Sequence, residues 1–211
     1  MTLRDISILT SCATPEWPGD TRFSCGWTAR LDHGASVNVS AISTSPHVGT
    51  HADAPLHVRD GAPASEWLPI DAFVGPVVVL SVTGAARDIG VAEIALRVPA
   101  GATRLLLRTG SSIADGYFPS DWPALHPSAA RALTARGIRL VGVDAPSVDR
   151  RESQSLAVHH ALFGAGAVVL ENLDLREVDD GDYNLVALPM RWAGLDAAPV
   201  RALLQAPSAA R

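Results

Sequence analysis

The sequence predicts a single α/β domain over residues 1–211, built around a mixed β-sheet. A length of 211 residues fits one domain, at roughly 100–200 residues per domain. Hydrophobic residues make up 47% of the chain and charged residues 18%, which excludes intrinsic disorder. Segments with the pattern of strands outnumber those with the pattern of helices, which favours a sheet as the main layer.

The predicted strands are short apolar runs, mostly rich in Val, Ile and Leu. Such runs are typical of strands that are buried in a sheet. A further segment alternates enough between apolar and polar residues to form another strand. In chain order the predicted strands cover residues 37–42, 77–82, 104–107, 138–143, 167–170 and 185–188.

Helical patterns are scarcer. The clearest helix is predicted over residues 127–136, because Pro127 suits a first helical turn and Gly137 suits a helix end. Shorter helices are expected at 91–96 and 200–204.

The composition excludes several classes of partner. The formal charge is −5, and all 17 basic residues are Arg. An acidic chain without basic runs is a poor candidate for binding nucleic acid or an anionic membrane. Two cysteines, Cys12 and Cys25, are too few for a disulfide framework. The N-terminus lacks the pattern of a signal peptide, and the longest apolar stretch is far shorter than the ~20 residues of a membrane span. We therefore expect a cytoplasmic protein with reduced thiols.

Three of the seven histidines, His47, His51 and His57, fall within eleven residues, together with Asp53. Imidazole and carboxylate groups are ligands of zinc, and also of manganese or iron. In an extended strand, His47 and His51 would lie ~13 Å apart, too far to share one ion. The chain must turn between them, and Gly49 allows this turn because it tolerates positive φ.

We expect the predicted strand at 37–42 to end in a compact loop that brings His47, His51 and Asp53 to one point. The alternative, ordinary histidines in a polar loop, is disfavoured by the number of ligand-type residues in so short a segment. A second segment supplies further ligands, because Glu171 directly follows the predicted strand at 167–170 and His159 precedes it. By itself this second segment is equally compatible with a loop cap and a solvated histidine.

The run His47-Val-Gly-Thr-His-Ala-Asp-Ala-Pro-Leu-His57 resembles the hallmark motif of the bacterial cyclase family of metal-dependent hydrolases. The resemblance extends to Trp17-Pro-Gly-Asp20 and to residues 141–149, 159–171 and 182–201, and so spans essentially the whole chain. It implies the swivelling β/α/β-type fold of the family, with a mixed sheet, commonly assembled as a homodimer.

The resemblance also implies a site with two metal ions, usually zinc, with manganese possible. In this family pattern His47, His51 and Asp53 hold the first ion. Asp53 bridges to the second ion, which His159 and Glu171 complete, with Glu171 also close to the first.

Within the family, the Trp17-Pro-Gly-Asp20 motif is most similar to that of members that hydrolyse N-formyl-L-kynurenine to L-kynurenine and formate, a step of tryptophan degradation. The implied mechanism uses a hydroxide held between the two ions. His57 is the implied proton donor and acceptor, since an imidazole can take up and release a proton. Trp17 is expected to line the substrate pocket, although by sequence alone it could equally be an ordinary core or edge tryptophan.

The same residues are also compatible with other functions. An isatin hydrolase-like enzyme, or another cyclic amide or ester hydrolase, would share the metal ligands but differ in its pocket. A non-catalytic metal-binding module is disfavoured, since a structural zinc closed by four ligands has no use for His57 as a free proton carrier. A serine hydrolase is disfavoured because no Gly-x-Ser-x-Gly motif is present. Because the chain has no Lys, an Arg or backbone amides are expected to bind the amino acid group of the substrate.

Overall fold

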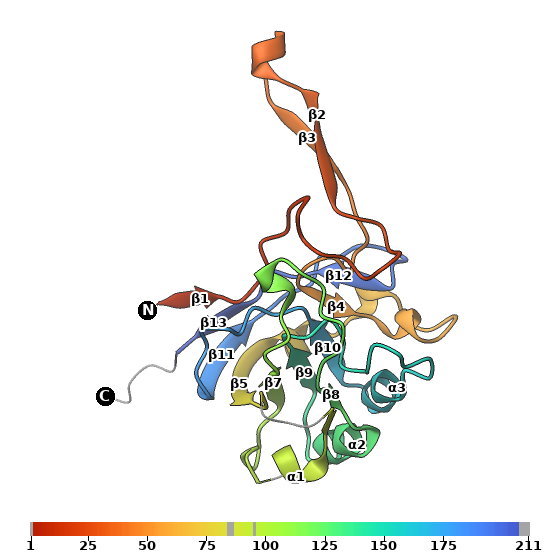
Figure 1. Ribbon diagram of the computed structural model, residues 1–211, viewed down its shortest axis with the longest axis vertical. Helices are drawn as coiled ribbons and strands as arrows, with labels where there is room; N and C mark the ends of the chain where they lie inside the picture. Colours follow the sequence, from red (N-terminus) through yellow and green to blue (C-terminus); the bar gives the residue numbers. More distant parts are fainter. Residues whose placement is uncertain (1, 84–86, 95, 207–211) are drawn as a thin grey trace.

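The computed structural model describes residues 2–83, 87–94 and 96–206. Within these ranges the main layer is a nine-stranded mixed sheet with the strand order β1-β13-β11-β5-β7-β9-β10-β4-β12 (Figure 1). The strands in chain order are β1 (Leu3–Asp5), β4 (His51–Asp53), β5 (Val74–Ser81), β7 (Arg104–Arg108), β9 (Leu140–Val143), β10 (Val168–Glu171), β11 (Gly181–Val186), β12 (Ala197–Pro199) and β13 (Leu203–Gln205).

The centre of the sheet is parallel and its flanks are antiparallel. Strands β5, β7, β9 and β10 run parallel to one another, while β11 and β4 pair antiparallel on either side. The helices α1 (Val91–Ile94), α2 (Pro127–Ala135) and α3 (Ala157–Gly164) contribute to the apolar cluster on one face. Successive side chains of β7 point to opposite faces of the sheet. Leu105 and Leu107 therefore join the apolar cluster that includes the helices, and Leu106 joins the cluster on the other face.

Smaller elements complete the fold. A second parallel pair consists of β6 (Asp88–Ile89) and β8 (Ala124–Leu125). Short 3-10 turns, η1 to η5, lie at Leu31–His33, Pro55–His57, Ser65–Trp67, Ile70–Phe73 and Ile113–Asp115. None of the helices in the described ranges is long and apolar enough to cross a membrane.

The predicted α/β fold with a mixed sheet is confirmed. The strands predicted over the apolar runs are also confirmed, and they correspond to β5, β7, β9, β10 and part of β11. The long helix is also confirmed as α2, with Pro127 in its first turn and Gly137 at φ +94° beyond its end. The short helix predicted at 91–96 is present over residues 91–94 as α1, while residue 95 lies outside the described residues and 96 is in a turn. The helix predicted at 200–204 is wrong, because β13 begins there, with Ala202 and Leu204 buried in a two-residue alternation.

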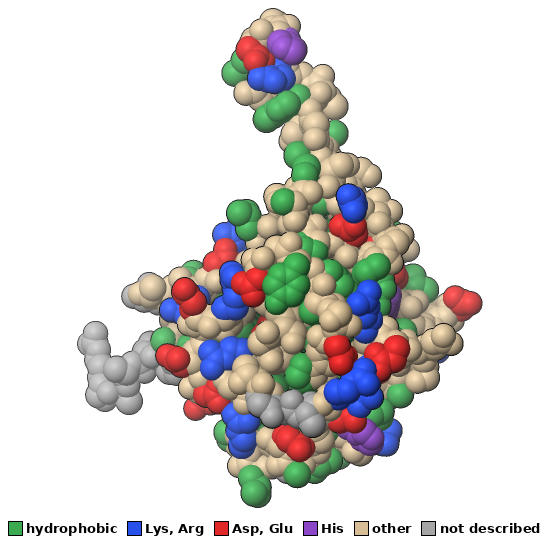
Figure 2. All heavy atoms as spheres, in the orientation of Figure 1, with side chains coloured by type: hydrophobic (Ala, Val, Ile, Leu, Met, Phe, Trp, Pro, Cys, Tyr) green, Lys and Arg blue, Asp and Glu red, His purple; other side chains and the backbone are tan. Residues whose placement is uncertain are grey.

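The strand predicted at 37–42 exists as β3 (Val39–Ser43), but it does not join the main sheet. It pairs with β2 (Ser24–Ala29) in a two-stranded hairpin that projects away from the body of the molecule (Figure 1). We call residues 24–43 the arm. Space-filling spheres show apolar side chains along the arm (Figure 2). The large apolar side chains of the arm that are exposed by more than half are Trp27, Leu31, Val37 and Ile42.

Candidate metal and catalytic site

Two adjacent strands place three ligand-type side chains on one face of the sheet. His51 and Asp53 lie two residues apart on β4, so they point to the same side. Strand β4 pairs antiparallel with β10 in a register that sets His51 directly opposite Glu171. All three side chains are buried. The expectation that a loop carries His51 and Asp53 is therefore wrong, since both belong to the sheet.

The turn before β4 delivers His47 to the same place. Gly49 has φ +76°, which confirms the predicted need for a residue that tolerates positive φ. A Cβ atom on Gly49 would also overlap Thr10 Oγ1. The turn brings the ring centroids of His47 and His51 to 4.9 Å from each other.

Helix α3 delivers His159 from the other side. Its Nε2 lies 3.1 Å from Asp53 Oδ2 and 3.4 Å from Glu171 Oε1. Its Nδ1 lies 2.7 Å from Asp149 Oδ2, and the same oxygen accepts a hydrogen bond from the His159 backbone N–H. Asp149 therefore fixes the orientation of the ring and leaves Nε2 facing the two carboxylates. Glu171 is fixed in turn, because its Oε1 accepts a hydrogen bond from the Val148 N–H at 2.8 Å.

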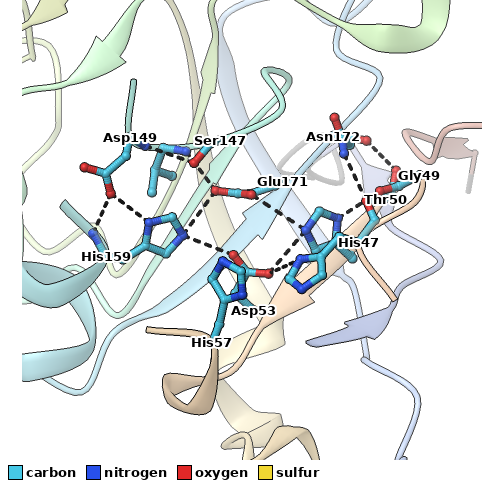
Figure 3. A network of polar contacts seen from close by, with 12 residues as sticks. His47, Gly49, Thr50, Asp53, His57, Ser147, Asp149, His159, Glu171 and Asn172 are labelled. Atoms are coloured by element: carbon cyan, nitrogen blue, oxygen red, sulfur yellow. Dashed lines mark hydrogen bonds and ion pairs between the residues drawn. The ribbon is translucent and has the colours of Figure 1, made fainter. Parts of the chain in front are cut away.

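These side chains form two donor sets that share Asp53 (Figure 3). Asp53 Oδ1 lies 3.1 Å from His47 Nδ1 and 3.2 Å from His51 Nε2, whereas Oδ2 faces His159. In each set the ligand-type atoms lie within 4.8 Å of one another. The sets are His47, His51 and Asp53, and Asp53, His159 and Glu171.

The hydrogen bonding within the first set fits a bound cation. His51 Nδ1 lies 2.9 Å from the Gly49 carbonyl oxygen, which can only accept, so Nδ1 carries the proton and Nε2 a lone pair. Within the described residues, His51 Nε2 and Asp53 Oδ1 are buried and have no hydrogen-bond partner. Leaving a buried polar atom unpaired costs about 1–3 kcal/mol. Two buried acceptors that face each other are stabilised by a positive charge between them, which a metal ion would supply.

The pKa values in this cluster reflect the same electrostatics. Burial works against the charged form of each group, but the neighbouring partners outweigh it. Contacts with the carboxylates of Asp196 and Asp53 raise the pKa of His47 to about 10, and the pKa of His159 also lies well above its ordinary value. The surrounding imidazoles hold the pKa of Asp53 well below its usual range. The cluster therefore attracts positive charge, and protons compete with a metal for the same lone pairs.

His57 lies beside the two donor sets and belongs to neither. It sits in the 3-10 turn Pro55–His57, with its ring centroid 4.5 Å from that of His47 and 5.8 Å from that of His159. Its Nδ1 lies 3.2 Å from Asp196 Oδ2, and the same oxygen lies 3.0 Å from His47 Nε2. His57, His47 and Asp196 form a further group of ligand-type atoms.

Asp149 and Asp196 are contributors to the site that the sequence did not reveal. Asp149 lies within the 141–149 motif. The motif could mark Asp149 as a functional residue, but it could not predict that Asp149 contacts His159. Asp196 stands near the end of the chain without a neighbouring ligand-type residue, so no local pattern marks it.

The donor sets border a cavity of ≈ 320 Å³, a size that suits a small organic ligand. Trp17 lines this cavity and is 39% exposed, with its ring edge-on to Phe118 at 5.4 Å and to Trp122 at 5.8 Å. Among the described lining residues there is no arginine. The hydrogen-bonding groups on its wall include Ser147 and Asn172.

The fold is that of a known class. The chain belongs to the cyclase family, whose profile, described as "Putative cyclase", matches residues 4–150. A solved structure described as a potential metal-dependent hydrolase with cyclase activity has a TM-score of 0.83 and 30% identity, over 98% of this chain and 99% of that one.

Two particular relatives carry names for their activities. Kynurenine formamidase from Salinibacter ruber (strain DSM 13855 / M31) is 44% identical over 207 residues, which cover 97% of this chain and 98% of the relative. Isatin hydrolase A from Labrenzia aggregata, solved with benzyl benzoate bound, is 27% identical, with a TM-score of 0.81 over 96% of this chain and 93% of that one.

Proposed function

We propose that this protein is a metal-dependent hydrolase that converts N-formyl-L-kynurenine to L-kynurenine and formate. The observation that carries the proposal is the pair of donor sets that share the buried Asp53 at the edge of the cavity. The 44% identity to a kynurenine formamidase over nearly the whole chain supports the choice of substrate.

Two zinc ions per chain are the proposed cofactors. His47, His51 and Asp53 would hold one ion, and Asp53, His159 and Glu171 the other. Imidazole and carboxylate donors suit zinc, and manganese is the alternative with the same donors. When bound, such ions polarise a carbonyl oxygen and lower the pKa of water.

His57 is proposed to carry the proton that the reaction needs. Hydrolysis joins the oxygen of water to the formyl carbon and breaks the C–N bond, so the leaving arylamine nitrogen must gain a proton. His57 lines the cavity, and within the described residues its Nε2 has no hydrogen-bond partner. This nitrogen is therefore free to exchange a proton with a substrate in the cavity.

Trp17 is proposed to bind the aromatic ring of the substrate. With Phe118 it gives the cavity an apolar wall, and edge-to-face contacts with Phe118 and Trp122 hold its ring in place. A flat ring can pack against that wall while the formamide group lies toward the donor sets.

Isatin hydrolysis is the second candidate, favoured by the similarity to isatin hydrolase A. Rates of hydrolysis of N-formylkynurenine and isatin by the same metal-loaded preparation separate the two. We expect kcat/KM to be higher for N-formylkynurenine by at least about tenfold, since a pocket shaped for one substrate discriminates by that much or more. A higher kcat/KM for isatin would contradict the proposal.

A second copy of this chain is the proposed partner of the arm. Two strands alone are marginally stable in water, and within the described part of the chain β2 pairs with β3 alone. Apolar side chains such as Trp27 (58% exposed) and Ile42 (59% exposed) would be covered in a homodimer.

A further inference from the structure

One carboxylate oxygen holds two of the histidines in the site. Asp196 Oδ2 lies 3.2 Å from His57 Nδ1 and 3.0 Å from His47 Nε2. We infer that Asp196 is a positioning residue for the hydrolysis, which acts through His57 by fixing its tautomer and the direction of its Nε2. The inference rests on the proposed function of His57 as the proton carrier.

The backbone of Asp196 is fixed against the segment that carries His57. Its carbonyl oxygen accepts a hydrogen bond from the Ala54 N–H at 2.8 Å, and Ala54 directly precedes the turn that ends at His57. The next residue, Ala197, pairs with Asp53 in the β4–β12 ladder. The contact between Asp196 and His57 is therefore set by the sheet and is not a loose contact between surface side chains.

The chemistry of the contact determines where the protons lie. An ionised carboxylate only accepts hydrogen bonds, so the Asp196 oxygen takes an N–H from each of the two imidazole nitrogens that it contacts. The proton of neutral His57 is then on Nδ1, which contacts Asp196, and its lone pair is on Nε2. A ring without this anchor could turn or carry its proton on Nε2, and neither arrangement accepts a proton there.

Asp196 Oδ2 also fixes which ring nitrogen of His47 carries the proton. In the neutral ring that metal binding requires, an N–H at His47 Nε2 donates to Asp196 and the Nδ1 lone pair faces Asp53. Asp196 therefore needs no metal of its own, because it accepts two N–H groups. A metal ion bound by Asp196 itself is the competing interpretation, and it predicts that the metal content falls when this carboxylate is removed.

The test uses Asp196→Asn, which keeps the shape of the side chain and can present an amide N–H to His57. With metal held in excess, we expect an unchanged metal content, a kcat lower by about 100-fold and a KM changed little, as for loss of general acid–base catalysis. His57→Ala with Asp196→Asn should be no slower than His57→Ala alone, since residues that act as a unit are not additive. Asp196→Glu should recover part of the lost kcat.

Glu66→Gln is the matched control. Glu66 Oε2 accepts a hydrogen bond from the Gly194 N–H at 3.0 Å, so this change removes a carboxylate that contacts the same segment without touching His57. We expect its kcat to equal that of the unchanged protein. Fully additive losses in the double variant, or loss of metal from Asp196→Asn in excess metal, would overturn the inference.

A readout independent of the substrate comes from NMR of the zinc-loaded protein with 15N-labelled histidine. We expect His57 to show a proton on Nδ1, and Asp196→Asn to lose that signature. A His57 proton on Nε2 in the unchanged protein would overturn the inference. Failure of the unchanged protein to hydrolyse N-formylkynurenine would instead contradict the proposed function, and the NMR result would still decide the role of Asp196.

Discussion

At the scale of single residues, the turn at Gly49 determines whether His47 and His51 can share a metal ion. Gly49 has φ +76°, where an L side chain is strained by about 1–2 kcal/mol, and its carbonyl oxygen also holds His51 Nδ1. We expect Gly49→Ala to lower both metal content and turnover, because Thr10 blocks the added methyl group and the turn must shift. Elemental analysis and the hydrolysis assay measure the two effects.

Gly137→Ala provides the comparison. Gly137 has φ +94° at the end of α2 and nothing within 4 Å of an added Cβ, so the substitution adds strain far from the donor sets. We expect it to lower the free energy of unfolding by about 1–2 kcal/mol and leave metal content and turnover unchanged. Equal metal content and turnover in Gly49→Ala and Gly137→Ala would show that the Gly49 turn does not set the site.

The sequence could predict the dense ligand cluster but not the residues that orient it. The short interval from His47 to Asp53 marks a metal site because ligand-type side chains rarely gather so closely without one. Asp149 and Asp196 act through contacts with His159 and His57, and they are separated from Asp53 by much of the chain. Such contacts depend on strand pairing, which local spacing does not specify.

At the scale of secondary-structure elements, the arm is the feature whose apolar surface most needs a partner. We expect Trp27→Ser to shift the protein from dimer to monomer at a concentration where the unchanged protein is a dimer, because it removes a large apolar side chain from the proposed interface. Light scattering coupled to size-exclusion chromatography measures the mass.

Trp67→Ser is the control for the arm, because Trp67 is 73% exposed but lies outside it. We expect this variant to remain a dimer. A monomeric unchanged protein, or a dimer that survives Trp27→Ser and further polar changes at Ile42 and Leu31, would contradict the proposed partner of the arm.

Strand predictions succeeded where apolar runs were long enough to indicate burial, as in β5 and β7. The alternation at 37–42 indicated a strand but not its partner, so the projection of the arm could not be foreseen. The helix predicted at 200–204 failed because a segment of five residues fits either period, and pairing of β13 with β1 and β11 decided the outcome.

At the scale of the whole molecule, the order of strands in the sheet brings the ligand-type residues of the site together. The antiparallel strand β4 lies beside β10, although more than a hundred residues separate them in sequence, and this pairing sets His51 opposite Glu171. The sequence predicted a mixed sheet, yet strand order arises from packing across the entire chain. The family resemblance supplied what periodicity could not, namely that the segments 47–57 and 159–171 meet.

Metal content and N-formylkynurenine hydrolysis, measured on one preparation purified without chelator, test most directly whether the two donor sets form a hydrolytic metal centre. We expect about two ions per chain, loss of hydrolysis when a chelator removes them, and recovery when zinc or manganese is returned. Glu171→Ala should lose metal and hydrolysis together. Hydrolysis that persists in the metal-free protein, or a protein that binds no metal, would contradict the central claim that these donor sets form a hydrolytic metal centre.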